Sequence, residues 1–217
     1  IGIVILAMGL TAVTSLFFGP QFWSMVTGGN AGAFGAIILM PVAAVMWLLA
    51  EYFGRRRRML LPTMAAISVF TLYSGLSIGM IASGLTGMNA KTVTSLTQAW
   101  DTLGNTGVGT FLGCGAAAFL AWWRFRLPFC MFLIAVSAAA TAYTFTGIFG
   151  DTGLVLGGLL SVIIGFATLA AAIWFDQQDP GRITRLSDNA FWLHVAAAPQ
   201  IILGLRGVVM GSPGATP

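Results

Sequence analysis

Long apolar runs alternate with short polar connections along the whole chain. They cover residues 1–18, 31–53, 59–85, 110–123, 127–150, 153–175 and 190–210. A transmembrane helix needs about 20 predominantly apolar residues, and most of these runs approach or exceed that length. Because backbone polar groups in lipid have to be paired within the segment, such runs predict helices. The pattern therefore predicts an all-α fold, a polytopic integral membrane helical bundle of about seven transmembrane helices forming a single domain.

The breaks in this pattern predict local features. Pro41, near the middle of the second run, is expected to kink its helix. The most hydrophilic stretch, 86–109, is expected to contain one short surface helix at about 90–103. A serine at position 187 is a plausible N-cap for the last helix. Since the first residue, Ile1, already lies inside an apolar run, we expect the true N-terminus to lie upstream.

Composition excludes a soluble domain. Hydrophobic residues make up 58% of the chain and charged residues only 7%, against about 25% charged residues in typical soluble proteins. The net charge of +4 does not indicate nucleic-acid binding, because eight of the ten Lys and Arg residues lie in three short loops. A nucleic-acid partner is therefore not expected.

These basic loops predict the orientation of the chain. With seven spans, the loops after spans two, four and six share one side, and they carry Arg55, Arg56, Arg57, Arg58, Arg124, Arg126, Arg182 and Arg185. The other side has only Lys91 and Arg206. Basic loops face the cytoplasm. The sequence thus predicts a multi-pass membrane protein whose N-terminus is cytoplasmic.

The run Arg55–Arg58 is longer than orientation requires. We expect these four arginines, together with Arg124 and Arg126, to contact anionic lipid headgroups or an acidic partner surface at the cytoplasmic face. Glu51 is the only glutamate in the chain. It lies one helical turn before the arginines, so the simplest interpretation is an ion-pair partner rather than a proton relay.

Small residues predict where helices pack. Gly157, Ser161 and Gly165 form a small-xxx-small stripe, which allows close backbone approach. Residues 75–79 match the G-x-S-x-G pattern of serine hydrolases. However, Ser77 and His194 differ in expected depth by roughly 20 Å at 1.5 Å rise per residue, so we interpret this motif as packing too.

Few residues suggest chemistry. His194 is the only histidine; it is a candidate axial ligand for a haem or pigment, or else a polar residue at the interface that bonds between helices. Cys114 and Cys130 are expected at different depths, which disfavours a disulfide. No metal or cofactor is otherwise indicated.

Hydroxyl side chains follow one face of two predicted spans, and their role stays open. The two sets are Thr71, Ser74 and Ser77, and Ser137, Thr141 and Thr144. Such hydroxyls can line a polar path, but they can also bond back to their own helix or to a neighbouring helix. A weak internal repeat, 48–62 echoed by 120–128, would suit a transporter.

The last loop carries a more distinctive pattern: Phe175, Asp176, Asp179, Pro180, Arg182, Thr184, Arg185, Ser187, Asp188, Ala190, Phe191, Trp192, Leu193, His194, Ala197, Ala198 and Pro199. It resembles a signature of uncharacterised bacterial multi-pass inner-membrane proteins, and Glu51-Tyr52 with the arginines and Leu61-Pro62 is similar to their upstream hairpin. The resemblance implies no activity.

Together these observations favour a non-catalytic membrane protein, an accessory or scaffold subunit of a larger inner-membrane complex. Membrane lipids and other membrane subunits are the expected partners. The alternative is a small-solute or lipid transporter built from repeated helical hairpins. An enzyme is not expected, because the chain lacks a cluster of reactive residues.

Overall fold

The computed structural model describes residues 32–57, 59–85, 96–146, 153–181 and 185–210. These residues contain six α-helices and one π-helical turn, and every regular element among them is helical, which confirms the all-helical prediction. The elements are α2 (Gly32–Glu51), η1 (Tyr52–Arg56), α3 (Leu60–Leu85), α4 (Leu96–Phe125), α5 (Phe129–Thr146), α6 (Gly153–Gln178) and α7 (Arg185–Met210).

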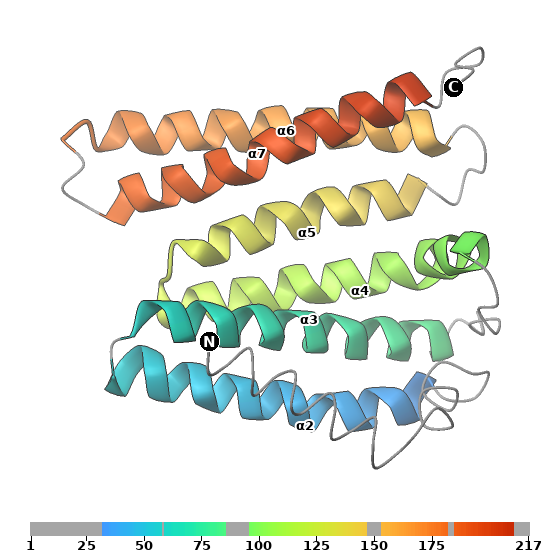
Figure 1. Ribbon diagram of the computed structural model, residues 1–217, viewed down its shortest axis with the longest axis horizontal. Helices are drawn as coiled ribbons and strands as arrows, with labels where there is room; N and C mark the ends of the chain where they lie inside the picture. Colours follow the sequence, from blue (N-terminus) through green and yellow to red (C-terminus); the bar gives the residue numbers. More distant parts are fainter. Residues whose placement is uncertain (1–31, 58, 86–95, 147–152, 182–184, 211–217) are drawn as a thin grey trace.

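The helices lie in a row that follows the order of the chain (Figure 1). Helices α2, α3, α4 and α5 stand side by side, each packed against the next, and the α6–α7 pair follows α5. Helix α7 packs against α5 as well as against α6. The described helices thus form an open row of hairpins, in which the two ends of the row stay apart.

Five of the described helices are long and apolar enough to cross a membrane. The candidate spans are Leu60–Ala82, Gly107–Phe125, Phe129–Thr146, Val155–Gln178 and Ser187–Val209. This supports a multi-pass membrane protein. The first predicted span, residues 1–18, lies outside the described residues.

Two predicted boundaries are wrong. The surface helix expected at about 90–103 is not separate where the structure describes it, because α4 continues unbroken from Leu96 to Phe125; residues 90–95 lie outside the described residues. Helix α7 begins at Arg185, so Ser187 lies inside its first turn and is not its N-cap. Asp188 also lies in that first turn, where a carboxylate is stabilised by the positive end of the helix dipole. Helix α2 continues through Pro41.

The contact between α3 and α4 depends on glycines in both helices. A Cβ atom at Gly75 would lie 2.7 Å from the Thr110 carbonyl oxygen, and one at Gly79 would lie 3.0 Å from Thr110 Cα. Gly113 on α4 faces Gly75 in return, and a Cβ atom at Gly113 would lie 3.1 Å from Gly75 Cα. Only residues without a side chain permit this approach, so the 75–79 motif serves helix packing.

The geometry also separates the two residues of the apparent hydrolase pair. Ser77 is buried and donates its hydroxyl hydrogen bond to the Tyr73 carbonyl at 2.8 Å. It belongs to α3, whereas His194 belongs to α7, and α4 and α5 stand between these helices (Figure 1). The two side chains therefore cannot act together.

The α6–α7 contact is equally close. A Cβ atom at Gly158 would lie 2.6 Å from the Gly204 carbonyl oxygen, and one at Gly204 would lie 2.8 Å from that of Gly158. In the predicted stripe, Gly165 faces Ile201 of α7, and the Ser161 hydroxyl donates to the Gln200 carbonyl at 3.1 Å. Gly157 instead faces Thr146 of α5. The stripe thus packs against two neighbouring helices, α7 and α5.

Two small hydrophobic cores hold the helices of the row together. The first joins α2, α3, α4 and the start of α5, and its buried members are Ala50, Ala66, Ile67, Ala121, Leu127 and Cys130. The second joins α5, α6 and α7 through Ala135, Ala172, Leu193 and Ala196. Trp192 of α7 also packs its ring edge-on against Phe129 of α5, with centroids 5.0 Å apart. Both cysteines are free, as predicted.

Candidate functional site: the basic end of the row

The C-terminal ends of η1, α4 and α6 and the N-terminal ends of α3, α5 and α7 all lie on the same side of the row (Figure 1). We call this side the basic end, because its first two turns, together with the helix ends beside them, carry Arg55, Arg56, Arg57, Arg124 and Arg126. Arg58 lies outside the described residues. The row thus brings together five of the six arginines that are expected to contact anionic headgroups or an acidic partner.

The two basic turns are built differently. After α2 the chain widens into η1, where the Arg57 N–H donates to the Tyr52 carbonyl at 3.2 Å. Helix α4 ends at Phe125, and Arg126 adopts a left-handed conformation with φ 52°. Its N–H donates to the Trp122 carbonyl at 2.8 Å. This hydrogen bond closes the end of α4 in the αL capping motif. Each turn therefore fixes its arginines relative to the end of a helix.

Glu51 ties these two turns to each other. Its Oε1 accepts a hydrogen bond from Arg55 Nη1 at 2.9 Å and another from Arg124 Nη2. The prediction that Glu51 is an ion-pair partner is confirmed for Arg55. The pair with Arg124, 73 residues away in sequence, joins the α2–α3 turn to the α4–α5 turn. One carboxylate thus faces two guanidinium groups.

The glutamate is only partly exposed. The side chain of Glu51 is 29% accessible, compared with 62% for Arg55 and 36% for Arg124. Its second oxygen, Oε2, is buried and has no hydrogen-bond partner within the described part of the chain. Because the partners are half exposed, water screens these pairs, and their contribution to stability is modest.

Two other arginines lie on aromatic rings. The Arg126 guanidinium carbon stands 4.9 Å from the centroid of the Trp122 ring. Arg57 donates from Nε to the Tyr52 hydroxyl at 3.3 Å and lies 6.0 Å from that ring centroid. This hydrogen bond raises the pKa of Arg57 above its ordinary value. Both cations are thus held beside residues of the interfacial type.

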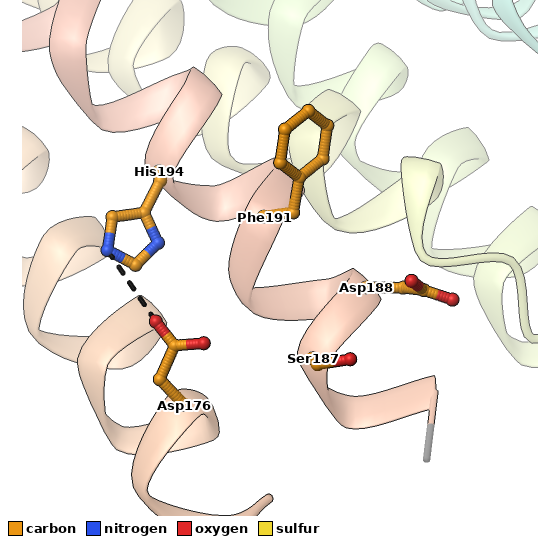
Figure 2. A pocket seen from close by; sticks show the side chains of 5 residues that line it. All are labelled: Asp176, Ser187, Asp188, Phe191 and His194. Atoms are coloured by element: carbon orange, nitrogen blue, oxygen red, sulfur yellow. Dashed lines mark ion pairs between the residues drawn. The ribbon is translucent and has the colours of Figure 1, made fainter. Parts of the chain in front are cut away.

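A cleft of about 530 Å³ lies between the end of α6 and the start of α7 (Figure 2). Its lining residues are Asp176, Ser187, Asp188, Phe191 and His194. The imidazole of His194 and the carboxylate of Asp176 point toward each other across the two helices (Figure 2), with Nε2 and Oδ2 3.9 Å apart. Nδ1 lies 2.8 Å from the Ala190 carbonyl oxygen.

These contacts define what His194 can do. Nδ1 faces the Ala190 carbonyl of its own helix and Nε2 faces the Asp176 carboxylate of α6, so both ring nitrogens already lie beside polar groups of the chain. Among the described residues, no group of three His, Cys, Asp or Glu side chains could hold a metal ion. The role of His194 as an axial ligand stays a prediction.

Most hydroxyls inside the helices are satisfied locally. Thr141 donates to the Ser137 carbonyl at 2.7 Å, and Thr144 donates to the Ala140 carbonyl at 2.9 Å. Ser77 does the same toward Tyr73. Of the two roles that the sequence leaves open, back-bonding to the same helix is the one these three residues adopt.

Gln200 is the polar residue that sequence reasoning missed. Only 5% of it is exposed, and its amide oxygen lies 3.3 Å from Thr168 Oγ1 on α6. The amide nitrogen has no hydrogen-bond partner among the described residues. The signal in the sequence was a lone glutamine in an apolar helix next to Pro199.

Neither the protein-family models, nor the curated proteins, nor the solved structures compared with this chain match it. The resemblance carried by the last loop therefore stays a prediction.

Proposed function

We propose that this chain is a non-catalytic multi-pass membrane protein that serves as an accessory or scaffold subunit of a larger bacterial inner-membrane complex. In the proposed topology it has seven spans, the N-terminus is cytoplasmic, and the basic end of the row faces the cytoplasm. The bias of eight basic residues against two supports this orientation.

The open row of helices is the observation that carries this proposal. In each of the five candidate spans, no more than 33% of the most apolar window is buried inside the chain. Large apolar side chains remain exposed on different helices, for example Leu112, Ile163 and Ile202, which are 58%, 61% and 66% accessible. Each helix is thus left with a wide surface that lipid or another membrane protein has to cover.

A transporter is the alternative, and it needs an enclosed polar path between its helices. The hydroxyls of Ser77, Thr141 and Thr144 bond to carbonyls of their own helices, so they contribute little to such a path. Two observations favour it: the Gln200 amide nitrogen and the Thr71 hydroxyl are both buried and have no hydrogen-bond partner within the described residues. These two groups lie on α7 and α3, at opposite parts of the row, so they support a polar path less well than the exposed helix faces support a scaffold.

Photo-crosslinking in native membranes tests the proposal. A photoreactive amino acid is placed at one exposed position at a time: Leu72 of α3, Leu112 of α4, Ile163 of α6 or Ile202 of α7. A subunit that docks through part of its surface gives a discrete protein adduct at some of these positions and none at the others. Lipid adducts alone at all four positions would contradict the proposal.

A further inference from the structure

The arginines of the basic end fall into two groups with different surroundings. Arg55 and Arg124 turn toward the Glu51 carboxylate. Arg56, Arg57 and Arg126, which we call the outer arginines, are exposed, and none of them forms an ion pair among the described residues. Glu51 therefore pairs with one arginine of each basic turn, and the outer arginines remain exposed at the surface.

Aromatic rings fix the depth of two outer arginines. Arg57 is bonded to the hydroxyl of Tyr52 and lies beside its ring, and Arg126 lies over the ring of Trp122 at 4.9 Å. Tyrosine and tryptophan at the ends of membrane helices sit at the level of the lipid headgroups. The guanidinium groups attached to these rings are consequently held at the level of the lipid phosphates.

The two basic turns form one continuous surface. The Glu51–Arg124 pair links them directly. A Cβ atom at Gly54 would lie 3.6 Å from the ring of Phe125, so the first turn lies next to the side chain that ends α4. The outer arginines of both turns thus lie where α2 and α4 end, on the same side of the row (Figure 1).

We propose that the outer arginines form a binding site for the phosphate group of an anionic membrane lipid. A guanidinium group offers parallel N–H donors that match two phosphate oxygens. A free phosphate ion has the same charge chemistry, but the aromatic rings at headgroup depth favour a phosphate that is anchored in the bilayer. This inference does not depend on whether the chain is a scaffold subunit.

The test is lipid retention by the full-length protein, measured by native mass spectrometry with phosphatidylglycerol or phosphatidylcholine added to the detergent. We expect Arg57→Gln and Arg126→Gln each to weaken phosphatidylglycerol binding about fivefold, which corresponds to about 1 kcal/mol for one arginine near an anionic surface. The double variant should lose roughly twenty-five-fold. Phosphatidylcholine binding should not change.

Arg206→Gln is the matched control, because it removes the same charge from the part of α7 that lies far from the basic end (Figure 1). It should leave phosphatidylglycerol binding unchanged. Thermal unfolding in detergent verifies that each variant is folded. The Arg57→Lys and Arg126→Lys double variant, which keeps the charge and loses the planar fork, should bind with an intermediate affinity.

Three results would overturn the proposal. Equal losses for Arg126→Gln and Arg206→Gln would show that the effect is one of net charge alone. Displacement of phosphatidylglycerol by an equal concentration of inorganic phosphate would show a site for a soluble anion. Unchanged lipid binding together with the loss of a co-purifying acidic protein would assign the outer arginines to a protein partner.

Discussion

The α3–α4 and α6–α7 contacts solve the same packing problem with different chemistry. Both bring backbones together through glycines, Gly75 and Gly113 in the first and Gly158 and Gly204 in the second. The second contact adds the buried Ser161 hydrogen bond and the Thr168–Gln200 pair. Since lipid tails are as apolar as leucine, helix association in a membrane depends on close van der Waals contact and on interhelical hydrogen bonds.

Close backbone packing and interhelical hydrogen bonds contribute different amounts of free energy. An interhelical hydrogen bond in a membrane protein contributes on average about 0.6 kcal/mol, because the separated helices also find partners. A side chain forced between two backbones costs about 1–3 kcal/mol. Loss of a glycine should therefore destabilise either contact more than loss of a polar side chain does.

The largest effect is expected for Gly158→Ala. The three nearest atoms to its new Cβ are all backbone atoms of α7, the closest at 2.6 Å, so the two helices have to separate. We expect a loss of about 3 kcal/mol in the free energy of unfolding, measured by reversible unfolding in mixed micelles. Gly115→Ala is the control, because its Cβ would meet only Ser137 Cβ at 3.6 Å. Equal stabilities of the two variants would contradict the packing argument.

Gly75→Ala tests the other contact and should cost about 2 kcal/mol. Its Cβ would lie 2.2 Å from Cys114 Sγ, which can move, and 2.7 Å from the Thr110 carbonyl oxygen, which cannot. Adding Cys114→Ala should therefore restore part of the stability and leave a residual loss. Full restoration would show that the backbone approach is not limiting.

Glu51→Gln should have a smaller effect, about 1–2 kcal/mol, because hydrogen bonds to a charged group are lost at a half-exposed site. The double-mutant cycle with Arg124→Gln should give a coupling of about 0.5–1 kcal/mol that decreases at high salt. The same cycle with Arg56→Gln, whose side chain does not pair with Glu51, serves as the control. Equal coupling in both cycles would rule out a specific link between the turns.

The smallest effect is expected for Gln200→Leu. It removes the Thr168 contact, but it also removes a buried amide nitrogen without a partner among the described residues. These changes oppose each other, so stability should stay within about 0.6 kcal/mol of the parent chain. A loss of about 2 kcal/mol or more would show that the amide has a partner, such as water or another subunit.

Much of this fold could be predicted from periodicity and charge. Apolar runs that exceed the length of a span predict helices because lipid offers the backbone no hydrogen-bond partner. The positions of the arginines likewise predict that the α2–α3 and α4–α5 turns share one side. Run length and arginine position are local properties, so they can be read without knowing which helices are neighbours.

The remaining features depend on which helices become neighbours. The Glu51–Arg124 pair exists only because the ends of α2 and α4 come close enough for these two side chains to meet, although α3 lies between the two helices in the row. The same is true of Gly158, which meets Gly204 through the angle at which α7 crosses α6. The early start of α7 at Arg185 reflects helix propagation into charged residues, which an analysis based on hydrophobicity places in the loop.

The central claim is that the exposed faces of the row are covered by another membrane protein. Native mass spectrometry of the chain, extracted from its own membrane with mild detergent, tests this most directly. The account predicts a mass that corresponds to this chain together with at least one different membrane polypeptide in a fixed ratio. A solitary monomer that carries only lipid would contradict it.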